Sequence, residues 1–197
     1  MDFQDVVVKR RMVRSFEAKP LPAGAAQRIV DNARRGPSAG FAQGIEFLVL
    51  EGPEETGRYW DAELPEPYRK DFAWPHLLDA PLLVVVLSHK LTYLRRYAEP
   101  DKGWTDMDEA RWPVPYWHVD AGMAALLALL SAVDLGLGAC FFSVYDVPGF
   151  RRAFAVPDEY TPVGTVAAGY PRADDRPSLS TRRGRRPRAE VVHRGAW

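Results

Sequence analysis

HVDAGMAALLALLSAVDLGLG, residues 118–138, is the stretch of sequence that decides the fold. Residues 121–130 contain no charge and no proline, and the Ala, Leu and Met residues that dominate them are strong helix formers. Asp120 is placed to cap the start or to complement the helix dipole there, and Gly136 and Gly138 suit the end. The stretch therefore predicts a helix without the polar stripe of an amphipathic surface helix.

A helix that is apolar on every side needs a cover on every side. The uninterrupted apolar run is well short of the roughly 20 residues that span a bilayer, so a membrane is the less favoured cover. Two arrangements remain open. In one, a sheet covers one side while other helices or a partner subunit cover the other. In the second, the helix is the centre of a large monomeric core.

The composition is that of a globular domain without an excess of either positive or negative charge. The 197 residues suffice for one domain with a real core, and 26 basic side chains balance 26 acidic ones. This balance does not favour nucleic acid as a partner. Cys140 is the only cysteine, and the four histidines lack metal-ligand spacing, so we expect neither a disulfide nor a metal site. The first 14 residues lack the order of a signal peptide, which predicts a cytoplasmic protein.

Hydrophobic periodicity and turn residues predict the remaining elements. Residues 172–188, rich in Arg, Pro and Ser, are expected to be irregular, and residues 93–117 form an aromatic segment broken by three prolines. The expected helices cover 2–12, 23–35, 54–60 and 150–154, and the expected buried strands cover 45–51, 82–88, 140–144 and 163–169.

Four basic residues lie close together near the N-terminus, at Lys9, Arg10, Arg11 and Arg14. Such clusters are most often solvated surface. On a helix, however, Arg10 and Arg14 would point the same way because they are four residues apart. Guanidinium groups bind phosphate well, so an anion site is the functional alternative.

Five short segments carry a further signal: RRMVRSF (10–16), GPSAGFAQG (36–44), GLGAC (136–140), VGTVAAGYP (163–171) and RRPRAEVVHRGAW (185–197). In this order they resemble motifs of the nitroreductase-like FMN flavoproteins. That family opens with RRSxRxF and continues with APSxxNxQPW, a long helix ending in GLGSC, and VALVALGYP. It closes with RRPxEEVVHxxxW. The resemblance touches both ends and the middle of the chain.

The resemblance implies an α+β fold with a central mixed β-sheet flanked by helices, as a single nitroreductase-like domain over residues 1–197. It implies a homodimer with the long buried helix at its interface and two FMN sites built from both chains. Residues 52–117 would form a variable lid or substrate region, and residues 172–197 an extension that embraces the partner subunit. The cofactor-binding residues implied are Arg10, Arg11, Met12, Arg14, Pro37, Ser38, Ala39, Gly40, Gln43, Ala139, Cys140, Phe141 and Phe142, with one or more of Arg183, Arg185 and Arg186.

The implied reaction is ping-pong hydride transfer from NAD(P)H through the flavin to a nitroaromatic, a quinone or a similar flat acceptor. The flavin would carry the chemistry, and no acid or base of the protein is implied. The aromatic residues of 93–117 suit stacking on a flat, apolar or aromatic substrate, or else they cap the core beside the central helix. These aromatic residues are Tyr93, Tyr97, Trp104, Trp112, Tyr116 and Trp117.

The chain departs from the family's motifs at polar positions. Met12 occupies the position of a Ser in the family's motif, Phe41 that of an Asn and Gly44 that of a Pro. Leu126 and Leu127 occupy the positions of a frequent Gln-Asn pair. These changes remove polar groups that commonly lie near the flavin but leave the arginines in place. They keep two alternatives open. One is a specialised flavoenzyme of the same fold, a biosynthetic oxidase or dehydrogenase or a deazaflavin-linked enzyme. The other is a flavin-free ligand-binding protein.

Overall fold

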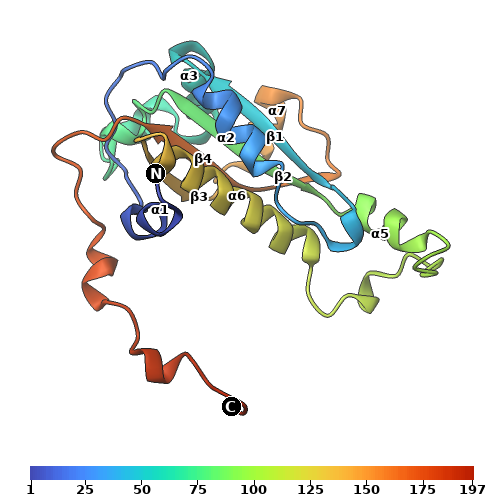
Figure 1. Cartoon of the computed structure of the whole chain (residues 1–197). Coiled ribbons are helices and arrows are strands. Elements are labelled where there is room, and N and C mark those ends of the chain that lie inside the picture. Colours follow the sequence, from blue (N-terminus) through green and yellow to red (C-terminus); the bar gives the residue numbers. More distant parts are fainter.

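A computed structural model describes all 197 residues (Figure 1). The chain forms seven α-helices and four β-strands, with two helices before each of the first three strands and short 3-10 turns between some elements. The helices are α1 (Phe3–Lys9), α2 (Ala25–Ala33), α3 (Pro53–Glu63), α4 (Glu66–Arg69), α5 (Lys90–Ala98), α6 (Tyr116–Asp134) and α7 (Val147–Phe154). The strands are β1 (Ile45–Glu51), β2 (Leu82–His89), β3 (Gly138–Phe142) and β4 (Tyr160–Gly169).

The four strands form one sheet in the order β1-β2-β4-β3. All three pairs of neighbouring strands are antiparallel, so the prediction of a mixed sheet is wrong. Parallel pairing is confined to one isolated bridge, between Met12 and Ala139. β2 lies inside the sheet and is buried along almost its whole length, as predicted, whereas β1 is an edge strand in which only Leu50 is buried. An apolar run alone does not distinguish an edge strand from a central one.

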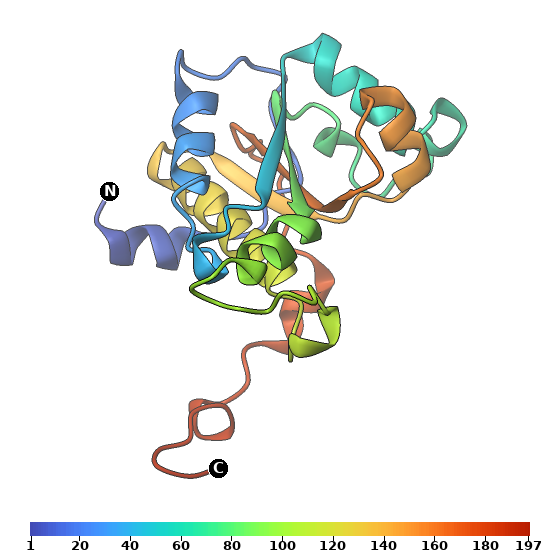
Figure 2. The same ribbon diagram turned by 90° about the vertical axis from the view of Figure 1, so that its right-hand side faces the viewer.

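Helices cover both faces of the sheet (Figure 2). Side chains that alternate along β2 enter two separate cores, because successive residues of a strand point to opposite faces. Leu82, Val84 and Val86 pack in one core with α2 and α6. Leu83 and Val85 pack in the other core with residues of α3 and α7. The structure is therefore a three-layer α+β domain.

α6 is the predicted long helix, but it starts at Tyr116, two residues before the quoted stretch. Asp120 is consequently inside the helix and does not cap it. The predicted end is confirmed: Gly136 adopts φ +76°, and the N–H of Leu137 donates to the carbonyl of Ala132 over 2.9 Å. This is a glycine-terminated Schellman motif. The length and apolar composition of α6 would also suffice for a membrane span, a criterion that core helices of soluble proteins meet too.

One side of α6 faces the sheet and α2, and the other side is largely uncovered within the chain, with only α1 beside it. The uncovered side carries apolar residues at helical spacing, and Val119 and Leu126 are 43% and 47% exposed. α1 lies beside this side and exposes Phe3 and Val8. The chain by itself thus leaves apolar side chains exposed on both α1 and α6.

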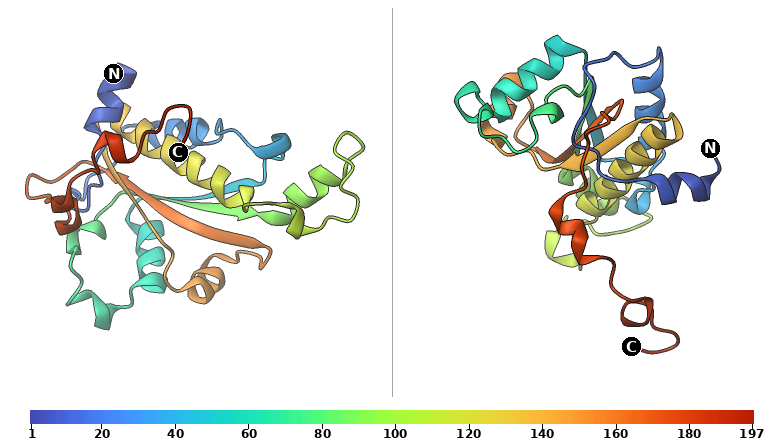
Figure 3. Two further views of the ribbon diagram at one scale, coloured as in Figure 1. Left: turned by 90° about the horizontal axis from the view of Figure 1, so that it is seen from below. Right: turned by 90° about the vertical axis from the view of Figure 1, so that its left-hand side faces the viewer.

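Two other predictions of local structure need correction. The first helix ends at Lys9, and the chain is extended over residues 11–14. No helix was predicted over residues 90–98, where the proline-broken aromatic segment 93–117 begins, but these residues form α5. The irregular C-terminal segment was predicted correctly: beyond residue 172 the chain has only two 3-10 turns and extends away from the body (Figures 1 and 3).

Candidate functional site

The basic segment after α1 forms one wall of a pocket. The N–H of Val13 donates to the carbonyl of Ala139 over 3.0 Å, and Val13 is 2% exposed. In an extended segment alternate residues share a side, so Arg10, Met12 and Arg14 all lie opposite to Val13. The helical spacing predicted for Arg10 and Arg14 is wrong, but the extended backbone still brings them to one pocket.

This cationic pocket has a volume of about 340 Å³ and takes its second wall from the C-terminal segment. Arg185 is the only one of the three candidate tail arginines that lines it. Arg183 does not line the pocket, and Arg186 bonds instead to Glu190 over 3.3 Å. The lining residues are Arg10, Arg11, Met12, Arg14, Pro177, Ser178, Ser180, Thr181 and Arg185.

Asp175 organises the cationic pocket. One of its carboxylate oxygens accepts the backbone N–H groups of Arg14 and Ser15, over 2.8 and 2.9 Å. The other oxygen pairs with Arg11, so one of the four guanidinium charges is already neutralised. Arg10, Arg14 and Arg185 have no acidic partner in the chain. Three free guanidinium groups around one cavity suit a phosphate group.

Arg14 also lines a second, adjacent pocket of about 460 Å³, the aromatic pocket, in which six of the twelve lining residues are aromatic. Its guanidinium lies 5.4 Å from the ring centre of Trp74, a cation–π contact. Glu63 and Ser143 contribute the other polar side chains of this aromatic pocket. The remaining lining residues are Trp60, Leu64, Phe72, Trp74, Leu77, Cys140, Phe141, Phe142 and Tyr145.

The candidates on β3 lie between the two pockets. Ala139 is paired with Met12, which lines the cationic pocket, while Cys140, Phe141 and Phe142 line the aromatic one. Burial raises the pKa of the Cys140 thiol to about 12. A neutral thiol is a poor nucleophile, which favours a packing role for this cysteine.

The loop of residues 36–44 is held by two hydrogen bonds to other elements and one hydrogen bond within the loop. The N–H of Ala39 donates to Asp120 over 2.9 Å, the N–H of Gln43 donates to the Ser38 hydroxyl over 3.0 Å, and Arg96 Nε donates to the Gly40 carbonyl over 2.8 Å. Gly40 has φ +61°, and a Cβ there would lie 2.6 Å from the Tyr97 ring, so this position requires glycine.

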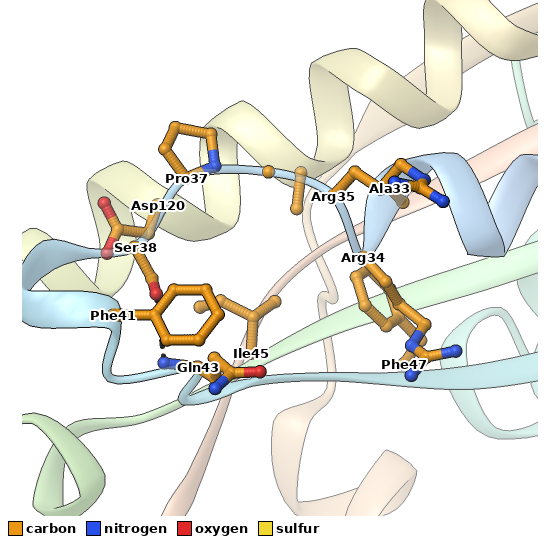
Figure 4. Close-up of a pocket in the computed structure, with 12 residues that line it drawn as sticks. Ala33, Arg34, Arg35, Pro37, Ser38, Phe41, Gln43, Ile45, Phe47 and Asp120 are labelled. Carbon is orange, nitrogen blue, oxygen red and sulfur yellow. Dashed lines mark hydrogen bonds between the residues drawn. The ribbon is translucent and has the colours of Figure 1, made fainter.

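Beside this loop lies a third pocket, of about 490 Å³ (Figure 4). Pro37, Ser38 and Gln43 line it together with Arg34, Arg35 and Asp120, while the Phe41 ring stands at its edge and is 75% exposed. Phe41 also has a left-handed backbone with φ +55°, which is uncommon for a residue with a side chain.

A single chain does not bring the two halves of the predicted cofactor site together. The loop is bonded to Asp120 near the start of α6, whereas Arg11 and Val13 share a small pocket with Gly136 beyond its end. Sixteen helical residues correspond to about 24 Å. The arginines and the loop of one chain therefore lie at opposite ends of α6.

The predicted lid region contributes to the site only in part. Its residues Trp60, Phe72 and Trp74 line the aromatic pocket, but β2, also within residues 52–117, is the centre of the sheet. The aromatic residues of 93–117 pack mainly on one another around Trp112, whose ring centre lies 4.4 Å from that of Tyr97. Tyr93 and Trp117 are buried. None of these six side chains lines the three pockets described above.

Sequence reasoning missed several residues of the site, among them Asp175, Trp74, Trp60 and Glu63. Asp175 lies 161 residues from the backbone it binds, and no local pattern connects the two. Trp74 and Glu63 lie in the segment that fits the family's motifs least. The only sequence signals for these residues were the proline that follows Trp74 and the position of Glu63 at the acidic end of a helix.

No group of three or more His, Cys, Asp or Glu side chains is arranged to hold a metal ion.

Comparison with known proteins identifies the chain. Residues 7–170 match the Nitroreductase family, so the chain belongs to the nitroreductase family and is an enzyme of this NAD(P)H oxidoreductase class. A Methanothermobacter thermautotrophicus protein assigned as an NADH dehydrogenase/NAD(P)H nitroreductase is 28% identical over 178 residues, which cover 87% of this chain and 78% of that protein.

Two further comparisons bear on length and fold. An NADPH-dependent oxidoreductase of Staphylococcus aureus is 27% identical over 87% of this chain, and the match spans 65% of that longer protein. The structure of an FMN-dependent nitroreductase from Clostridium difficile R20291 superposes with a TM-score of 0.69 and 19% identity, over 98% of this chain and 99% of that one. This likeness confirms the nitroreductase fold.

Proposed function

We propose that this protein binds FMN and passes hydride from NAD(P)H to a flat acceptor such as a nitroaromatic or a quinone. The observation that carries the proposal is the position of Arg14, which lines both the cationic pocket and the aromatic pocket. A ligand with a phosphate at one end and a flat ring at the other would fill two such adjoining cavities. The FMN named for the Clostridium relative and the NADPH named for the Staphylococcus relative support it.

The residues present fit such a cofactor. Arg10, Arg14 and Arg185 would hold the phosphate, and the hydroxyl groups of Ser178 and Thr181 add neutral donors to the same cavity. Phe142 and Trp74 would enclose the ring and exclude water from it. When bound, FMN supplies the hydride chemistry, while the protein supplies orientation and electrostatics.

The same proposal includes a homodimer built on α6. Two copies of α6 that cross antiparallel would bury each other's exposed apolar side, including Leu126. They would also place the start of one helix beside the end of the other. Residues 36–44 of one chain would then approach the arginines of its partner, and the site would be complete. Burial of exposed apolar side chains favours association.

The C-terminal segment supports the dimer as well. Nearly every residue beyond 176 is exposed, and Leu179 and Trp197 are 70% and 101% exposed. Beyond the part that lines the cationic pocket, the segment leads away from the domain (Figure 3). A second chain is the occupant that we propose for its apolar side chains.

The first test is the visible absorption spectrum of the purified protein, with mass identification of whatever acid releases. A flavin spectrum and the mass of FMN are expected. A different chromophore would favour the deazaflavin alternative. A colourless protein that stays colourless after incubation with FMN would favour the flavin-free binding protein and contradict the proposal.

A second test separates the reductase from an oxidative flavoenzyme of the same fold. NADH or NADPH, added without oxygen, should bleach the bound flavin within seconds. A flavin that stays oxidised in the presence of both dinucleotides would contradict NAD(P)H as the reductant. The spectrum in the first test would still stand, so the cofactor and the reductant are examined separately.

A further inference from the structure

Two side chains of α3 carry buried polar atoms that have no hydrogen-bond partner. They are the indole nitrogen Nε1 of Trp60 and the carboxyl oxygen Oε1 of Glu63. The two residues are three apart on a helix, so they share a face. Both line the aromatic pocket, and they do not bond to each other. One is a hydrogen-bond donor and the other an acceptor.

The surroundings of this pair explain why the lack of partners matters. Trp60 is 5% exposed, and its ring stacks on Phe142 with centres 5.7 Å apart. A buried donor or acceptor without a partner costs about 1–3 kcal/mol. A ligand with a hydrogen-bond acceptor and a donor side by side would satisfy both of these buried groups.

We propose that Trp60 and Glu63 bind the amide-type edge of a flat ligand, with Trp60 Nε1 donating to its carbonyl and Glu63 Oε1 accepting from its N–H. This inference rests on the proposed function, since it assigns an edge of the ligand that the aromatic pocket holds. Two ligands of that function carry adjacent C=O and N–H groups. One is the pyrimidine ring of the flavin, and the other is the carboxamide of the nicotinamide.

The other carboxyl oxygen of Glu63 has a separate role. It accepts the backbone N–H of Tyr145, which fixes the loop after β3. Burial raises the pKa of Glu63, and the nearby carboxylate of Asp146 adds to the rise. Arg14 is the cation on the same pocket. A ligand N–H at Oε1 would favour the ionised form and offset part of the burial cost.

The test uses conservative variants of both residues. Trp60→Phe keeps the aromatic ring and removes only the N–H. Glu63→Gln keeps an oxygen for Tyr145 and replaces the free acceptor with a donor. Glu54→Gln is the matched control, because Glu54 lies on the same helix and has an exposed side chain that makes no hydrogen bond within the chain.

The cofactor arm measures binding to the full chain freed of flavin. The wild-type chain should bind FMN at least about ten-fold more tightly than 3-methyl-FMN, in which a methyl group replaces the ring N–H. Glu63→Gln should lose this preference, and Trp60→Phe should weaken FMN and 3-methyl-FMN equally. The Glu54→Gln control should match the wild type.

The substrate arm uses the flavin-loaded protein and two dinucleotides, NAD⁺ and its 3-acetylpyridine analogue, which lacks the carboxamide N–H. A preference for NAD⁺ that disappears in Glu63→Gln would assign the pair to the nicotinamide. Both arms read binding, by flavin fluorescence, and not turnover.

Unchanged affinities and preferences of both variants in both arms would overturn the inference. An equal loss for FMN and 3-methyl-FMN in Glu63→Gln would overturn it too, because that result indicates a purely positioning role through Tyr145. If the wild-type chain binds no FMN, the proposed function fails and the cofactor arm fails with it. These results are distinguishable.

Discussion

The backbone N–H of Ala39 donates to the carboxylate of Asp120 over 2.9 Å, and this bond joins the loop after α2 to the beginning of α6. Asp120 is 2% exposed. The hydroxyl of Tyr93 lies beside it, and burial together with this carboxylate raises the pKa of Tyr93. Asp120 therefore positions a loop that carries five of the predicted cofactor residues.

Replacement of Asp120 by Ala should loosen that loop. The substitution leaves the N–H of Ala39 without its acceptor, so the free energy of unfolding should fall by about 1–3 kcal/mol. Urea denaturation measures the loss, and hydrogen exchange at the Ala39 amide measures the local effect. Asp120→Asn, which keeps an acceptor oxygen, is the control and should retain most of the protection. Unchanged exchange in Asp120→Ala would contradict the role of this bond.

Asp175→Ala should loosen the contact between the C-terminal segment and the arginine segment that together form the cationic pocket. It removes the acceptor of two backbone N–H groups and the partner of Arg11. FMN affinity should fall by about ten-fold or more, even though the substitution removes negative charge near a phosphate, because the wall of the pocket loses its anchor. Isothermal titration measures the affinity. Asp158→Ala, at a side chain that is 97% exposed, is the control. A gain in affinity would show that charge outweighs anchoring.

Arg14→Ala should weaken FMN binding by about 1.5–3 kcal/mol through the loss of a charge-assisted hydrogen bond. Riboflavin, which has no phosphate, should lose far less. The wild-type affinity for FMN should also fall as salt rises, while that for riboflavin should not. Arg95→Ala, at an exposed arginine with no ion pair, is the control. An equal loss of affinity for FMN and for riboflavin would show that Arg14 does not bind the phosphate.

His118 should make stability depend on pH in the mildly acidic range. Burial lowers the pKa of His118, nearby Lys90 lowers it further, and Glu109 opposes both; the ring bonds to the Ser88 hydroxyl over 3.1 Å. The folded chain thus binds this proton less readily than the unfolded chain, so stability is full above about pH 6.5 and falls as pH drops below it. Urea unfolding at pH 7 and 5.5 should show a smaller difference in His118→Gln than in the wild type. His193→Gln, in the exposed tail, should behave like the wild type.

The fold was largely predictable from local chemistry. Apolar runs with turn residues on either side placed all four strands, and the composition of residues 121–130 placed α6. Antiparallel pairing and the edge position of β1 depend on contacts between distant segments, so periodicity did not reveal them. The end of α1 at Lys9 was missed because Arg10–Arg14 have ordinary helix propensities, while pairing with β3 draws them into an extended form.

The site was predictable where motifs and geometry coincide. The pocket formed by Arg10, Arg14 and Arg185 joins residues from both ends of the chain, as the family resemblance implied. The choice of Arg185 over Arg183 and Arg186 depends on the path of an irregular tail, which no propensity describes. Glu63 and Trp60 were missed because their importance lies in partners that they lack, and only a structure shows that.

Leu126→Arg should separate the proposed dimer into monomers. Leu126 is 47% exposed in the middle of the uncovered side of α6, and an arginine there would place two charges against each other across a two-fold contact. Light scattering at micromolar concentration should give the mass of two chains for the wild type and one for the variant. FMN affinity should fall as well, because residues 36–44 of the partner would no longer reach the arginines. Tyr68→Arg, at another exposed apolar side chain away from α6, should remain dimeric. A wild-type monomer that still binds FMN tightly would show that one chain suffices, and the separation of about 24 Å between the two halves of the site would then have to be closed by movement within the chain.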